Sequence, residues 1–454
     1  MSASNVTIPF RSNTVAALSN VTLRSAMRNA TETFMQKRAD AVASAPLEEW
    51  REAASAIRME ALDHLPDYLD QFAKNATNAG AVIHRAKDSQ AAREIVGYVL
   101  KDRNINKVVK SKSMVTEEIH LNPYLERQGI QVVETDLGEY IIQIAGETPS
   151  HIIVPAIHKD RRQVGRLFAD KLHCDYTDNP ETLTKIARKT LREEFLSASA
   201  GISGANFAVA DSGSLVIFTN EGNGRMVTTL PPLHVAVLSI EKIIPSFADL
   251  KKFMRLLPRS ATGQTLTTYM SVITGTRKPM ESTGAEQLHI VLVDNGRSTI
   301  AQSEFREMLK CIRCGACLNA CPVYRLVGGH AYGTTYPGPM GIVLTTLLDG
   351  MKKSHTLLDA TTLCGACGTV CPVKVPLPKL LRRLREVRAE MGLTPAIERS
   401  GIAGFGLAVR SAGLFSLGQK MARTFMPVMA KILPRGVLGR MPSPASKTFK
   451  RSVT

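Results

Sequence analysis

Seven of the eight cysteines in this 454-residue chain lie between Cys311 and Cys371, in two short runs. The first run reads "CIRCGACLNACPV" and the second reads "TTLCGACGTVCPV". A disulfide framework would spread cysteines along a short secreted chain, whereas clustered C-x2-C steps in a long chain indicate metal or redox chemistry. The segment that carries these runs must therefore fold around its cysteines.

The first run has the spacing C-x2-C-x2-C-x3-C-P, which holds cubane iron-sulfur clusters. Two-residue gaps let one tight loop present three sulfurs to one cluster, and the cysteine before the proline is directed to a second cluster. Zinc is the alternative, because C-x2-C pairs also form tetrahedral thiolate sites. Two tandem runs that each end in Cys-Pro favour iron and sulfide over zinc.

Crossed ligation, as in two-cluster ferredoxins, uses all seven clustered cysteines. It assigns cluster one to Cys311, Cys314, Cys317 and Cys371, and cluster two to Cys321, Cys364 and Cys367. Cluster two has only three thiolates, because Thr361 stands where the second run should have its first cysteine.

Three interpretations of this missing ligand remain open. Cluster two is a 3Fe-4S cluster, or a 4Fe-4S cluster with one iron open to water or substrate, or it takes a fourth ligand from elsewhere in the chain. The candidates for such a ligand are Cys174, His330 and His355. The ordinary role expected of Cys174 is that of a small buried hydrophobic residue.

The chain before the cysteines predicts an α/β domain. Its length indicates two or three domains. Apolar residues at helical spacing predict helices over residues 23–80, ended by Gly80, and short apolar runs then alternate with helical ones, which indicates a parallel sheet. The predicted strands cover 81–84, 107–111, 130–135 and 151–156.

The second half of this domain predicts one long helix and more strands. A helix over 178–198 is capped by Asp178 or Asn179 and has Pro180 in its first turn. Two strands then meet at 211–213 and lead into a glycine-containing loop, "TNEGNGRM". The runs "HVAVLSI" and "LHIVLVD" add two further strands, and the domain ends near Ser303.

The loop "TNEGNGRM" offers the candidate catalytic residues Glu221 and Arg225. An arginine there could hold a carboxylate through two parallel hydrogen bonds, while a structural ion pair at a turn is the alternative. The loop is not a dinucleotide fingerprint, because a third glycine is missing and no strand-loop-helix unit is expected around it.

Net charge is +17, and the chain after Glu398 has ten lysines and arginines but no acidic residue. Such a segment attracts anionic lipid or an acidic partner, and "LFSLGQKMARTFMPVMAKIL" fits an amphipathic helix that lies on a membrane surface. From about residue 400 the periodicity weakens, which predicts an extended third segment. No run of about 18 apolar residues suits a membrane span, and we expect a cytoplasmic protein. Nucleic-acid binding is not expected, since no motif for it is present.

Four stretches together resemble the lactate utilisation protein B family. They are residues 201–246, "CIRCGACLNACPVYR", "YPGPMG" and "LCGACGTVCPVKVPLPKLL". The resemblance implies an α/β domain of the lactate-utilisation (LUD) type, related to isomerases and CoA transferases, followed by a helical two-cluster ferredoxin-like domain and a basic C-terminal extension. The expected boundaries are 1–57 for an N-terminal helical segment, 58–303, 304–394 and 395–454.

The resemblance also implies a function. It suggests an electron-transfer subunit that takes part in the oxidation of L-lactate to pyruvate, together with the A and C proteins of the same system. Two alternatives come from the residues themselves. The α/β domain could bind and act on a small carboxylate, or the clusters could be purely structural in a scaffolding subunit.

Overall fold

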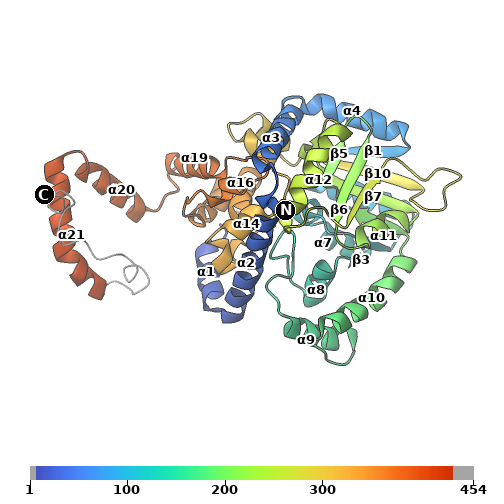
Figure 1. Ribbon diagram of the computed structural model, residues 1–454, viewed down its shortest axis with the longest axis horizontal. Coiled ribbons are helices and arrows are strands. Elements are labelled where there is room, and N and C mark those ends of the chain that lie inside the picture. The colour runs from blue at the N-terminus through green and yellow to red at the C-terminus, as the bar shows by residue number, and fades with distance from the viewer. Residues whose placement is uncertain (1–6, 433–454) are drawn as a thin grey trace. The chain divides into compact units, whose positions relative to one another are not determined.

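The computed structural model describes residues 7–432, and it separates into two compact units (Figure 1). The first unit ends at Val387 and the second begins at Arg388. The first contains both the α/β domain and the cysteine-bearing segment, so these two parts can be described together.

A six-stranded, fully parallel sheet forms the centre of the α/β domain. Its order is β1-β10-β7-β4-β2-β3. The strands are β1 Ala81–Ala86, β2 Lys107–Lys110, β3 Gln131–Glu134, β4 Ala200–Ser203, β7 Leu233–Ser239 and β10 Gln287–Val293. Parallel strands are buried on both faces and read as continuous apolar runs, as β7 does with all seven of its residues buried.

Helices cover both faces of this sheet, because successive strand residues point to opposite sides. Val108 packs with α5 and α7 on one face, and its neighbour Val109 packs with α8 and α10 on the other. The helices of the domain are α4 Leu65–Asn78, α5 Ser89–Lys101, α6 Met114–Glu118, α7 Leu121–Glu126, α8 Leu137–Ala145, α9 Arg161–Leu172, α10 Pro180–Ser197, α11 Asn223–Thr229, α12 Phe247–Ala261 and α13 Arg297–Ala301.

A smaller four-stranded sheet, in the order β8-β5-β6-β9, packs with α4 against the β1 end of the large sheet. Its strands are β5 Phe207–Val209, β6 Ser214–Thr219, β8 Ile243–Ile244 and β9 Tyr269–Ile273. The turn between β5 and β6 uses Gly213 at a positive φ of 67°, which only glycine adopts without strain. The 3-10 helix η1, Ile240–Lys242, joins β7 to β8.

The predicted strand over 151–156 is wrong, because these residues form turns. The ring nitrogen Nδ1 of His151 accepts hydrogen bonds from the backbone amides of Ile153 (3.0 Å) and Val154 (3.1 Å). These bonds curl the chain and compete with sheet pairing. The expectation that no strand-loop-helix unit surrounds "TNEGNGRM" is also wrong, since α11 begins at Asn223 directly after β6 and its loop.

The cysteine-bearing part is built from short helices joined by tight loops. They are η2 Arg306–Lys310, α14 Ala316–Ala320, α15 Tyr324–Val327, η3 His330–Tyr332, α16 Gly338–Asp349, α17 Met351–Ser354, η4 His355–Asp359, α18 Ala366–Thr369 and α19 Leu377–Glu390. N-terminal helices α1 (Phe10–Ser19) and α2 (Val21–Ala43) pack against this part, and α3 (Leu47–Asp63) packs against both η2 and α12.

After the last three residues of α19, the helices of the second unit in the described residues are α20 (Ala396–Ala408) and α21 (Ala412–Ile432). The expectation of an extended segment from about residue 400 is therefore wrong up to Ile432. The rest of the basic tail, including Arg435 and Lys447, lies outside the described residues, as does the start of the chain before residue 7.

Candidate iron-sulfur centres

One cavity is lined by four cysteines, namely Cys311, Cys314, Cys317 and Cys371. Burial raises the pKa of the Cys317 thiol well above its usual range, and repulsion from the neighbouring cysteines raises it further. Burial likewise raises the pKa of Cys314. Four convergent cysteine sulfurs form a donor set suited to iron, whose positive charge stabilises thiolates. The residues present therefore fit a 4Fe-4S cluster.

A second cavity is lined by three cysteines and by Thr361. The cysteines are Cys321, Cys364 and Cys367. Burial raises the pKa of Cys367 to about 11, and the nearby Cys321 contributes to this rise. Cys364 is exposed, so this cavity is open to solvent on one side. Three convergent thiols fit an iron-sulfur cluster that is short of one thiolate.

Thr361 reproduces the local backbone of the first run without supplying a sulfur. Its Oγ1 accepts a hydrogen bond from the Leu363 amide at 3.1 Å, and in the first run Cys311 Sγ accepts from the Arg313 amide at 3.5 Å. Leu363 and Arg313 have nearly the same positive φ, 55° and 59°. The threonine hydroxyl thus keeps the turn in place but is not the soft ligand that iron-sulfur clusters use.

None of the three other candidate ligands lines the second cavity. Cys174 packs with the apolar cluster around Phe168. His330 has its Nε2 2.6 Å from the Thr148 carbonyl oxygen, and His355 has its Nδ1 3.1 Å from the Lys352 carbonyl oxygen. Among the described residues, Thr361 lines this cavity and these three candidates do not.

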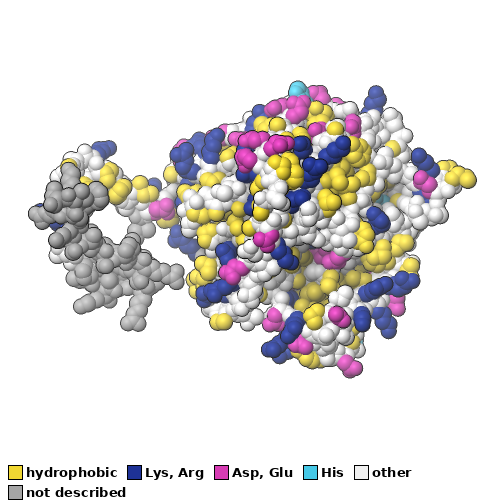
Figure 2. All heavy atoms as spheres, in the orientation of Figure 1, with side chains coloured by type: hydrophobic (Ala, Val, Ile, Leu, Met, Phe, Trp, Pro, Cys, Tyr) yellow, Lys and Arg dark blue, Asp and Glu magenta, His cyan; other side chains and the backbone are white. Residues whose placement is uncertain are grey.

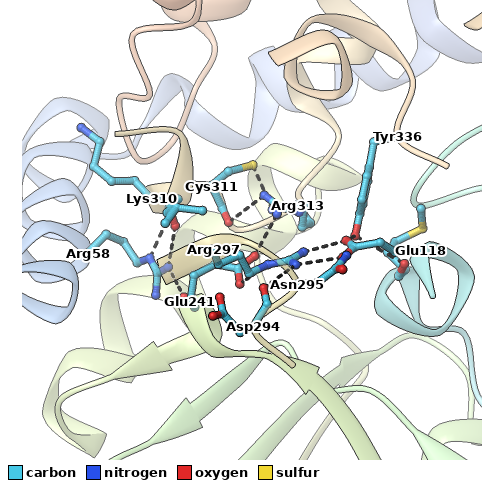
Figure 3. A network of polar contacts seen from close by, with 12 residues as sticks. Arg58, Glu118, Glu241, Asp294, Asn295, Arg297, Lys310, Cys311, Arg313 and Tyr336 are labelled. Carbon is cyan, nitrogen blue, oxygen red and sulfur yellow. Dashed lines mark hydrogen bonds and ion pairs between the residues drawn. The ribbon is translucent and has the colours of Figure 1, made fainter. Parts of the chain in front are cut away.

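A buried network of charged side chains joins the first cysteine run to the large sheet (Figure 3). Glu241, which follows β7, forms ion pairs with Arg297 (2.7 Å) and with Arg313 (2.9 Å). Arg297 also pairs with Glu118 at 2.6 Å. Burial alone would raise the pKa of Glu241, but the two arginines and the nearby Lys242 lower it to about 2, so it remains ionised. Its carboxylate is buried and shared between two arginines, and breaking a buried ion pair is costly.

Arg58 of α3 holds the same junction from the opposite side. Its guanidinium is fully buried and donates hydrogen bonds to backbone carbonyls that lie on either side of the domain boundary. The acceptors are the carbonyl oxygens of Glu241, Ile243 (2.7 Å), Leu309 (2.8 Å) and Lys310 (3.2 Å). The backbone just before Cys311 is therefore fixed to the end of β7.

Two more arginines of the N-terminal helices donate hydrogen bonds to the backbone of the second cysteine run, next to the first cavity. Arg51 Nε donates to the Cys371 carbonyl oxygen at 2.9 Å, and Arg38 donates to the Val370 carbonyl oxygen at 3.2 Å. The sequence analysis missed Arg38, Arg51 and Arg58 as residues of the site. Their partners are backbone carbonyls far away in the chain, so no motif marks them.

The other candidate residues, Glu221 and Arg225, lie apart from the cysteines and do not share a site. Glu221 lines a large cavity of about 510 Å³ in the α/β domain, where burial raises its pKa and the nearby Asp136 adds to the effect. Arg225 does not line that cavity, and its guanidinium lies 5.4 Å from the centre of the Tyr269 ring. The loop therefore does not present both side chains to one ligand.

Fold and cavities define a class of protein in which an α/β domain is joined to a segment that binds iron-sulfur clusters. Comparison with family models agrees: residues 69–293 match the LUD domain and residues 307–375 match the 4Fe-4S dicluster domain.

Comparison with curated proteins then identifies the family. The chain is 44% identical to lactate utilization protein B of Bacillus subtilis (strain 168), over 92% of this chain and 88% of that protein. It is 48% identical to the "Uncharacterized electron transport protein YkgF" of Escherichia coli (strain K12), over 82% of this chain and 78% of that protein. The chain belongs to the lactate utilization protein B family.

Among solved structures, a DUF162 family protein from Deinococcus radiodurans matches with 11% identity and a TM-score of 0.29. The match covers 50% of this chain and 98% of that one.

Proposed function

We propose that this protein is an iron-sulfur electron-transfer subunit that takes part in the oxidation of L-lactate to pyruvate. The single observation that supports this most is the division of seven cysteines between two neighbouring cavities. When bound, iron-sulfur clusters accept and release single electrons. The names of relatives at 44% and 48% identity, which refer to lactate utilisation and to electron transport, support the same function.

In this proposal the cysteines of the first cavity hold a 4Fe-4S cluster and those of the second hold cluster two. Thr361 gives the second cavity the backbone turn of a ligand loop and leaves one position without a thiolate. Cluster two is then either a 3Fe-4S cluster or a 4Fe-4S cluster with one open iron. Mössbauer and EPR spectra of anaerobically purified protein separate these two forms, and two clusters with four cysteine ligands each would contradict the proposal.

Lactate oxidation releases two electrons, whereas each cluster takes one at a time, so a partner has to complete the reaction. We propose that the partners are the A and C proteins of the lactate utilisation system. Co-purification of the three proteins without oxygen, followed by addition of L-lactate, tests this function. Reduced clusters in the EPR spectrum are the expected result. Clusters that stay oxidised in the assembled complex would favour a scaffolding role.

We further propose that the second unit attaches the protein to the inner face of an anionic membrane. None of the helices in residues 7–432 is long and apolar enough to cross a bilayer. Instead, α20 and α21 expose large apolar side chains next to lysines and arginines, as the yellow and blue atoms in Figure 2 illustrate. Among the exposed ones are Ile402, Phe405, Leu414 and Phe415. This combination suits binding to an anionic lipid surface.

A truncated chain without residues 400–454 tests the membrane proposal. Full-length protein should sediment with vesicles that contain anionic lipid and not with neutral vesicles, and the truncated chain should remain in the supernatant. Equal sedimentation of both chains would contradict the proposal, while iron content provides the control for correct folding.

A further inference from the structure

The large cavity of the α/β domain lies at the carboxyl ends of four parallel strands. Ser111 and Gly204 of its wall directly follow β2 and β4, while Asp136 and Lys242 come one and two residues further on after β3 and β7. The volume of the cavity is about 510 Å³. In open parallel sheets, ligands bind in the crevice outside the carboxyl ends of the strands. Polar groups and apolar side chains share the lining, as in a small-molecule site.

This cavity also reaches the first cysteine run. Arg313, which stands between two of the cysteines, lines its wall together with Tyr336. Ile152 lines both this cavity and the cavity of Cys311. A ligand in the large cavity would therefore be separated from the first cysteine cavity by single side chains.

Lys242 is the unusual residue of this wall. The residue is only 8% exposed. Glu241 lies near enough to attract its charge, but no described residue forms a hydrogen bond or a close ion pair with it. The other buried lysines among the described residues are paired: Lys110 lies 2.6 Å from Glu134, and Lys310 lies 3.0 Å from Glu307. An unpaired buried charge costs free energy, so its retention points to a ligand that supplies the missing partner.

The backbone around Lys242 is held rigidly. Arg58 donates hydrogen bonds to the carbonyl oxygens of the residues immediately before and after it, Glu241 and Ile243. These hydrogen bonds fix the backbone of Lys242 on η1, and its side chain lines the cavity. Such support of a binding residue from behind is what a preorganised site requires.

Charges elsewhere on the wall limit the ligand to one negative group. Lys112 is 3.5 Å from Asp136, and Arg313 is paired with Glu241, so the unpaired cation is Lys242. Glu221, on the same wall, is an acidic group that would repel a second carboxylate.

We propose that this cavity binds a small monocarboxylate of the 2-hydroxy or 2-oxo acid class, with its carboxylate on the ammonium group of Lys242. The choice of acid class rests on the proposed function, while the anion site rests on the unpaired lysine. In this proposal the small acid binds to this chain itself, beside the first cysteine cavity, and not to a partner protein.

Isothermal titration calorimetry on oxidised, cluster-loaded protein tests the proposal without turnover. L-lactate and pyruvate should each bind at one site. Lactamide has no negative charge and should bind at least about 10-fold more weakly, because a hydrogen bond to a charged group is stronger than one between neutral groups. Malonate should also bind more weakly than pyruvate. No measurable binding of lactate or pyruvate would overturn the proposal.

Variants at Lys242 locate the site. Lys242→Met should weaken pyruvate binding by about 10- to 100-fold. Lys242→Arg should retain binding within a few fold, and Lys252→Met, at a partly exposed lysine of α12, should not change it. Equal pyruvate binding by wild type and Lys242→Met would overturn the assignment of the carboxylate to Lys242. A shift in the cluster's reduction potential without a change in binding would mean that Lys242 only balances the charge of the cluster.

Thermal unfolding gives a second, independent measurement. Lys242→Met should fold at least as stably as wild type without ligand, because it removes an unpaired buried charge. Pyruvate should raise the melting temperature of wild type and leave that of the variant unchanged. If the protein binds pyruvate but its clusters are not reduced by lactate, only the proposed function is contradicted. If lactate reduces the clusters but the protein binds neither acid, only this inference is contradicted.

Discussion

The two cysteine cavities have similar loops and different surroundings. The cavity of Cys314 lies against the α/β domain, and arginines from α2, α3 and the first run fix the backbone around it. The cavity of Cys364 opens to solvent. There Arg385 donates a 2.7 Å hydrogen bond to the carbonyl oxygen of Thr361. The first cavity is thus built into the protein's interior, and the second is placed where water or a partner can reach it.

This difference has a physical consequence for how each cluster would be stabilised. Burial raises the pKa of Cys314 and Cys371 in the first cavity, and the nearby positive charges of Arg38 and Arg51 offset part of this rise. The second cavity has fewer such groups and one thiolate less. The comparison predicts that loss of the first cluster disturbs the fold, whereas changes at Thr361 alter the cluster and leave the fold intact.

The largest expected effect is that of removing a thiol from the first cavity. Cys317→Ala should abolish the cluster there, lower the iron content by roughly half and destabilise the fold, because cluster binding and folding are coupled. Iron analysis and thermal unfolding measure both outcomes. Cys174→Ala, at a cysteine packed in an apolar cluster, is the matched control and should keep full iron content. Full iron in Cys317→Ala would contradict the ligand assignment.

The next largest effect concerns the ion pairs behind the first cavity. Glu241→Gln leaves Arg297 and Arg313 without their shared carboxylate and should destabilise the protein by about 3–5 kcal/mol. Glu286→Gln breaks an exposed pair with Arg277 and should cost at most about 1 kcal/mol. Denaturant unfolding of both variants measures the difference, and similar costs would show that the buried network does not hold the junction.

The same glutamate predicts a dependence of stability on pH. Its folded-state pKa is lowered to about 2, whereas an unfolded glutamate titrates near about 4.3. Its contribution is therefore complete above the unfolded value and is lost as the pH falls toward 2. The stability gap between wild type and Glu241→Gln should narrow over this interval. A gap that stays constant down to pH 3 would mean that Glu241 is not ionised in the folded protein.

The smallest effect is expected for the hydroxyl of Thr361. Thr361→Val removes the acceptor of the Leu363 amide and should cost about 1 kcal/mol without loss of iron. Thr361→Ser keeps the hydroxyl and should lie within a few tenths of a kcal/mol of wild type. Iron loss in Thr361→Val, with iron retained in Thr361→Ser, would show instead that the hydroxyl binds iron.

The main features of the fold could be predicted because they depend on local patterns. Short apolar runs marked β1, β2 and β3, and Asn179 with Pro180 marked the start of α10. The segment at 151–156 could not be predicted, because the turn depends on His151, whose ring accepts two backbone amides and lies 3.2 Å from Asn319 of the cysteine domain. An apolar run alone does not reveal such a contact.

The site could be predicted only where a motif marked it. Cysteine spacing identifies the iron-sulfur domain, which the family comparison also identifies. Arg58 and Lys242 belong to the site through contacts, or a lack of contacts, with residues far away in the chain. An unpaired buried lysine looks like any other lysine in a sequence. Its significance is apparent only when its surroundings are known.

The central claim is that the second cavity supplies three thiolates and that Thr361 marks the missing fourth. Mössbauer spectra of wild type and Thr361→Cys, both purified without oxygen, test it most directly. The account predicts that wild type has one cluster with a 3Fe-4S signature or a distinct open iron, and that the added thiol converts it to a 4Fe-4S cluster like the first. Identical spectra for the two proteins, each with two fully cysteine-ligated 4Fe-4S clusters, would contradict the account.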